Sequence, residues 1–112
     1  MSYWTAPSRR MSKILYNEQK HAKEIVENIC DFYGLTTVQV KGKCRMRSYV
    51  KARFIAIYMI RKRTGLTLKE IGRIFHRDHT SIIHACQTID EVLSLKFDND
   101  YQEEIKKILQ LF

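Results

Sequence analysis

The sequence lacks several features that define common protein classes. Its 112 residues include only three cysteines, one proline and four glycines. The cysteines are widely spaced and form no C-x-x-C pair, which argues against a disulfide framework and a zinc ribbon. No G-x-x-x-x-G-K-[ST] loop occurs, so we expect no nucleotide-binding site. Apolar runs long enough to span a bilayer and the apolar core of a signal peptide are also missing. These absences predict a cytoplasmic protein with no membrane segment.

Acidic residues are missing from one long stretch of the chain. Lys and Arg total 20 against 12 Asp and Glu, which gives a formal net charge of +8. Between Lys41 and Arg63 nine basic residues occur without an acid, whereas from Asp90 onward six acids outnumber three lysines. The positive charge is therefore local, as on a binding face, and it favours a polyanionic partner. Two of the later acids, Glu103 and Glu104, are expected to stay away from that partner.

The length is sufficient for one domain with a modest core. Residues 1–12 hold the single proline and two arginines and show no periodicity. We interpret them as a flexible basic arm that follows a phosphate backbone or a minor groove, with an ordinary frayed terminus as the alternative. Residues 13–112 are expected to form the folded domain.

Apolar residues repeat at helical spacing in several segments. A first amphipathic helix is predicted from about residue 15 to residue 33, where Gly34 marks its end. A second pattern, from residue 49 to about residue 64, is apolar nearly all round in its middle, which predicts a central core helix with Ser48 as N-cap. Residues 36–40 are interpreted as a short helical turn, although their β-branched side chains also favour a strand. With a last helix near the C-terminus, these patterns predict five to six helices in an all-α fold.

The stretch of residues 67–86 predicts two helices that meet at a polar corner. Thr67 and Glu70 have the spacing of a capping box, and apolar residues at helical spacing follow them. The pattern breaks at His76, after which Asp78 is a good N-cap for a second helix. A short helix, a tight turn and a longer helix are typical of a helix-turn-helix, whose second helix places its first residues in the major groove of DNA.

The side chains at the polar corner suit DNA. Arg77 carries a planar fork of donors for phosphate or guanine, and Asp78 can accept from a cytosine amine. His79 and Thr80 offer hydrogen-bonding groups and apolar surface for a thymine methyl group. Ser81 lies where the N-terminus of a helix favours a nearby phosphate. The alternative is a well-capped polar turn on the surface.

A second basic cluster lies around the start of the central helix. Its members are Lys43, Arg45, Arg47, Lys51 and Arg53. Positive charge is unfavourable at a helix N-terminus, so we expect an anion to bind there. Arginine suits phosphate better than lysine does, although a solvated basic face is the alternative. Together, the cluster and the polar corner predict that residues 13–112 form a single helix-turn-helix domain that binds double-stranded DNA.

Residues 75–89, FHRDHTSIIHACQTI, closely resemble the DNA-binding C-terminal domain of the bacterial replication initiator DnaA. That family is marked by an Arg-Asp-His-Thr-Thr stretch followed by an apolar pair and His-Ala. The similarity covers about residues 17–95, including the basic loop and the first helix of the helix-turn-helix. It implies an all-α fold of the TrpR-like helix-turn-helix type, no cofactor, and recognition of short, asymmetric DnaA-box-like duplex sites in replication initiation or its regulation.

The resemblance also implies a role for each candidate residue. Arg77, Asp78, His79 and Thr80 would read the major groove, Ser81 would lie near the backbone, Arg45 would enter the minor groove, and Arg47, Lys51 and Arg53 would contact phosphates. Three departures bear on box preference: His76 alone stands where the family usually has two glycines, and Ala52 and Phe54 replace the common proline and glutamine. The start of the chain favours a stand-alone protein over an excised domain.

Other functional classes fit the sequence less well. Three histidines, His76, His79 and His84, lie near a cysteine but do not share one helical face, so we expect no metal site. That cysteine, Cys86, belongs to a predicted buried stripe, where a thiol is normally inert, so we expect no enzyme activity. The serious alternative is a protein-interaction or transcription-regulatory module with a different box preference or none.

Overall fold

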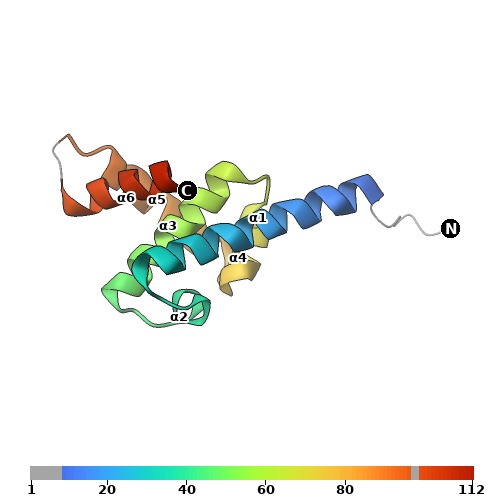
Figure 1. Cartoon of the computed structure of the whole chain (residues 1–112), viewed down its shortest axis with the longest axis horizontal. Coiled ribbons are helices and arrows are strands. Elements are labelled where there is room, and N and C mark those ends of the chain that lie inside the picture. The colour runs from blue at the N-terminus through green and yellow to red at the C-terminus, as the bar shows by residue number, and fades with distance from the viewer. Residues whose placement is uncertain (1–8, 97–98) are drawn as a thin grey trace.

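The computed structural model describes residues 9–96 and 99–112, and of residues 9–14 it describes the backbone alone. These residues form six helices and no strand, which confirms the predicted all-α fold (Figure 1). In chain order the helices are α1 (Arg9–Tyr33), α2 (Thr37–Lys41), α3 (Arg47–Arg63), α4 (Leu68–Phe75), α5 (His79–Leu93) and α6 (Asp100–Leu111). None of them combines the length and the apolar character that crossing a bilayer requires.

Helix α3 is the centre of the fold. It packs against α1, α2, α4 and α5, and every side chain from Ile55 to Ile60 is buried. A helix that is apolar on all sides is stable only when neighbours cover all of its faces. The prediction of a central core helix in this segment is therefore confirmed. Its first residue is Arg47 and its cap position is Met46, so the predicted N-cap at Ser48 is wrong, because the first helical hydrogen bond already joins Val50 N to Met46 O.

Helix α1 is longer than the sequence pattern suggested. It begins at Arg9, so the last four residues of the expected 12-residue arm are helical, and residues 1–8 lie outside the described residues. Among its described side chains the first buried one is Ala22, and its N-terminal part projects beyond the other helices (Figure 1). The helix ends before Gly34, which has a φ of 67° as a helix-terminating glycine commonly does.

Side-chain caps fix the starts of four helices, among them α2, α4 and α5. The capping box predicted at the start of α4 is confirmed, since Thr67 Oγ1 accepts from Glu70 N at 3.2 Å. Asp78 caps α5 as predicted, accepting from Ser81 N at 3.0 Å. The short helical turn expected at residues 36–40 is α2, which is held by a second capping box that begins at Thr36. These local bonds make the helix starts readable from sequence.

The turn between α4 and α5 is very tight. His76 follows α4 in the left-handed region, with a φ of 55°. Arg77 N donates to Gly72 O at 2.8 Å, and His76 N donates to Arg73 O at 3.4 Å. This is the hydrogen-bond pattern of a Schellman motif, in which a single left-handed residue is sufficient to end the helix. The turn therefore closes with one residue where the family usually has two glycines.

The tight turn leaves no room for a side chain at Gly72. A Cβ atom at this position would lie 2.4 Å from Arg77 O, and both groups belong to backbone that is fixed by the turn. We expect Gly72→Ala to lower the free energy of unfolding by about 2–3 kcal/mol, even though alanine is the better helix former. Gly65→Ala is the matched control, because a Cβ there meets nothing closer than 4.0 Å. Urea unfolding followed by circular dichroism measures both changes, and equal stability of the two variants would contradict this account.

Candidate nucleic-acid interface

The N-terminal end of α5 is exposed and rigidly held. Asp78, His79, Thr80 and Ser81 are all exposed to solvent. The Asp78 carboxylate accepts from the Thr80 hydroxyl and from Ser81 N, and these hydrogen bonds lower the pKa of Asp78 below its usual value. Asp78 is therefore ionised at neutral pH and fixes the first turn of the helix. The neighbouring His79 side chain is left free to meet a ligand.

Arg77 lies at this corner but points back into the protein. Its Nη1 donates to Phe75 O at 2.7 Å and to Lys41 O at 3.0 Å, and its Nη2 donates to Gly42 O at 2.6 Å. The side chain is half-buried, and burial lowers the pKa of its guanidinium. This arrangement differs from the expectation that Arg77 reads a base, because three hydrogen bonds already tie the guanidinium to backbone carbonyls.

Arg53 also differs from its expected role on phosphate. The side chain is only 5% exposed, and its Nε donates to Val40 O at 2.8 Å. Its Nη2 donates to Gly42 O at 2.9 Å and to Cys44 O at 3.0 Å. Burial, followed by the nearby charge of Arg77, lowers the pKa of this guanidinium. No local sequence pattern indicates this inward orientation, because the carbonyls lie 9 to 13 residues earlier in the chain.

The basic loop, residues 42–46, carries the exposed cations of the interface. Lys43 and Arg45 are exposed, and so is Arg47 at the first position of α3. A groove of about 640 Å3 separates this loop from α5, and its lining includes Arg45 from the loop and Ser81 from the helix. The two segments that the sequence singled out therefore border one groove, although they lie more than 30 residues apart in the chain.

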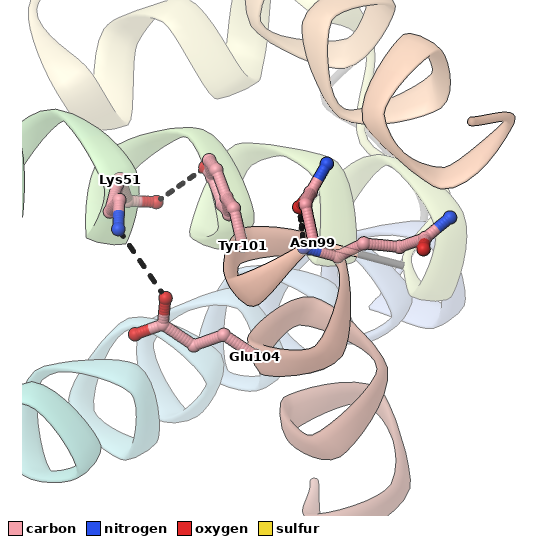
Figure 2. Close-up of polar contacts among 5 residues, drawn as sticks. Lys51, Asn99, Tyr101 and Glu104 are labelled. Carbon is pink, nitrogen blue, oxygen red and sulfur yellow. Dashed lines mark hydrogen bonds and ion pairs between the residues drawn. The ribbon is translucent and has the colours of Figure 1, made fainter. Parts of the chain in front are cut away.

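Lys51 is held by the last helix. Its Nζ lies 3.6 Å from Glu104 Oε2 and 5.0 Å from the centre of the Tyr101 ring, and the Tyr101 hydroxyl donates to Lys51 O at 3.5 Å (Figure 2). Asn99 caps α6 at this point by accepting from Gln102 N at 2.7 Å (Figure 2). Glu104 was expected to stay away from DNA, but the sequence analysis did not predict that it pairs with Lys51. No pattern within either helix signals a contact across 53 residues.

Phe54, like Glu104, was not among the residues that the sequence predicted to bind DNA. Its ring packs edge-on against His84, with the ring centroids 5.9 Å apart, and both residues line the groove between the loop and α5. This pair therefore adds aromatic surface to the lining of the groove. Within the described residues, no group of three or more His, Cys, Asp and Glu side chains gathers as metal ligands would.

Comparison with known proteins identifies the family. Residues 22–89 match the family described as bacterial dnaA protein helix-turn-helix. The chain is 38% identical over 85 residues, 75% of its length, to the chromosomal replication initiator protein DnaA of Limosilactobacillus reuteri. It is 34% identical over 90 residues, 80% of its length, to the DnaA of Wolbachia sp. subsp. Brugia malayi. It spans only 19% of the length of each of these relatives. The chain belongs to the bacterial DnaA helix-turn-helix family.

Proposed function

We propose that the chain binds double-stranded DNA sequence-specifically, at short asymmetric sites like DnaA boxes, as a non-catalytic module in replication initiation or its regulation. The observation that carries this proposal is the position of the basic loop across one groove from the exposed start of α5. Cations and an exposed helix N-terminus on the same face suit a duplex, because phosphates bind the cations while the helix enters the major groove. The relatives bear the name chromosomal replication initiator protein, which supports the same role.

The start of α5 supplies the sequence-reading groups. His79 and Thr80 are exposed on its first turn and meet base edges in the major groove. Asp78 is fixed by its capping bonds and offers its remaining acceptor capacity to a cytosine amine. Ser81 adds a hydroxyl close to the sugar-phosphate backbone, while its backbone N–H remains bonded to Asp78.

The basic loop supplies the second contact. Arg45 is exposed next to the groove and enters the minor groove beside the reading helix, where the negative potential favours a guanidinium. Lys43 and Arg47 flank it and contact phosphates. Lys51 contributes to phosphate binding once it leaves its partner on α6.

A protein-interaction module is the second candidate function. It is favoured by a shallow, mostly apolar groove of about 470 Å3 whose lining includes Val50, Phe54, Val92 and Tyr101. Arg45 and Arg47 border this groove as well, so a protein ligand and DNA would compete for the same side of the molecule. Salt dependence separates the two candidates, since an apolar docking face responds weakly to salt.

The first test is fluorescence-anisotropy titration of a DnaA-box duplex and a scrambled duplex of equal composition, each at two salt concentrations. We expect the box to bind at least about tenfold more tightly, because specific contacts add to the phosphate contacts common to both. With about six phosphates neutralised, the log-log slope against salt should be about −5. Equal, salt-sensitive binding to both duplexes would support DNA binding but reject the box preference. Binding to neither duplex would favour the protein-interaction module.

The separation of reading and phosphate contacts predicts two kinds of variant. His79→Ala should lower the ratio of box to scrambled affinity by about tenfold, because a base contact serves only the correct sequence. Arg47→Ala should weaken both duplexes alike and reduce the magnitude of the salt slope by about one. Both variants are measured in the same anisotropy assay. A parallel loss on both duplexes for His79→Ala would reject its reading role.

The ion pair on α6 predicts a gain of affinity. Glu104→Gln removes the carboxylate 3.6 Å from Lys51 Nζ, which frees the ammonium group for phosphate. We expect all duplexes to bind about two- to fivefold more tightly at low salt, the range that a partly exposed ion pair allows. Glu103→Gln is the matched control, since it makes the same charge change at an exposed position of the same helix. An identical gain in both variants would show that net charge alone is responsible.

A further inference from the structure

Two arginine side chains from distant parts of the chain bind the same carbonyl. Arg53 in α3 and Arg77 in the turn before α5 each donate from Nη2 to Gly42 O, at 2.9 and 2.6 Å. Burial, followed by the charge of Arg77, lowers the pKa of Arg53, and the two cations repel each other at this point. Such an arrangement is stable only because carbonyl dipoles face both guanidinium groups.

The arginines together bond four carbonyls of the segment that leads into and forms the basic loop. Arg53 binds those of Val40, Gly42 and Cys44, and Arg77 binds those of Lys41 and Gly42. This segment leaves α2 at Lys41 and enters α3 at Arg47, so residues 42–46 have no helix of their own to hold them. With these carbonyls directed toward the arginines, the side chains of Lys43 and Arg45 remain exposed.

The second arginine connects the loop to the reading helix. Arg77 immediately precedes Asp78, the N-cap of α5, and its backbone is fixed by the tight turn after α4. Its guanidinium therefore links the start of α5 to the carbonyls of residues 41 and 42. A planar guanidinium can hold two carbonyls in fixed directions, which a lysine ammonium on a flexible stem cannot do.

We propose that Arg53 and Arg77 are positioning residues that fix the basic loop relative to the start of α5, so that Arg45 and His79 reach adjacent grooves of one duplex together. In this role Arg77 acts on DNA through the loop, and not by reading a base. The inference rests on the proposed function for its DNA part, while the order of the loop can be measured without DNA.

A double-mutant cycle tests the DNA part. Arg45→Ala, Arg77→Met and the double variant are compared for binding to the box duplex. If each single change lowers the affinity for the box duplex about tenfold, the double variant should bind only about tenfold to thirtyfold more weakly than the wild type. The reason is that a misplaced loop has already lost the contact of Arg45. A loss of about a hundredfold would mean that Arg77 contacts DNA independently of the loop, which overturns the proposal.

A second cycle supplies the matched control. His79 lies on α5, whose first turn keeps its own cap from Asp78. The affinity losses caused by His79→Ala and Arg77→Met should therefore multiply in the double variant. Strong coupling between the two changes would assign Arg77 to base reading beside His79. Arg77→Lys keeps the positive charge but loses the two-carbonyl geometry, so it should behave like Arg77→Met. Full recovery of affinity by lysine would show that charge alone matters and would overturn the positioning role.

The loop itself is measured by backbone ¹⁵N relaxation on the free protein. In Arg77→Met the amides of residues 43–45 should become mobile on the nanosecond timescale, while those of α3 and α5 keep their order. The retained order of the helices shows that the variant is folded. An unchanged loop would overturn the proposal even if the wild-type chain bound no DNA. Binding of both duplexes with equal affinity by the wild type would instead refute the proposed box recognition.

Discussion

The tight turn between α4 and α5 is the constraint on which the interface depends. Gly72 lets Arg77 O approach to a distance that no Cβ would allow, and His76 takes the left-handed conformation that ends α4. The chain then leaves the turn with Arg77 directed at the carbonyls of residues 41 and 42 and with Asp78 in position to cap α5. One local backbone geometry thus sets both the direction of α5 and the position of Arg77 beside the basic loop.

The sequence predicted the features that depend on neighbouring residues. Helical periodicity and caps act over three or four positions, so the α4 capping box at Thr67, the Asp78 cap and the central helix α3 were all readable. The start of α3 was misplaced because Ser48 is a better capping residue than Met46, while the structure begins the helix without any side-chain cap. Capping preference is worth only about 1 kcal/mol, and tertiary packing readily exceeds it.

The candidate site was predicted as a set of residue types and not as an arrangement. The sequence assigned ten residues to DNA, and the structure exposes seven of them. Among the exposed ones, Arg45 of the basic loop and Thr80 and Ser81 of α5 line one groove. The inward direction of Arg53 and Arg77 and the pairing of Lys51 with Glu104 were not predicted. Apart from Phe75 O, which lies two residues before Arg77, their partners lie 9 to 53 residues away. Long-range hydrogen bonds leave no periodic signal in the chain, so residue type alone could not separate an exposed cation from one bound to carbonyls.

This separation changes the meaning of the net charge of +8. Arginines bound to carbonyls add to the positive potential of the basic face, but part of their hydrogen-bond donors is already used. The side chains of Lys43, Arg45 and Arg47, by contrast, are exposed. A buried guanidinium also loses little conformational entropy when a ligand binds, since its rotamer is already fixed. The basic face thus combines exposed cations, whose charge attracts polyanions at long range, with cations that backbone carbonyls hold in place. Composition measures the first effect, and only the fold determines the second.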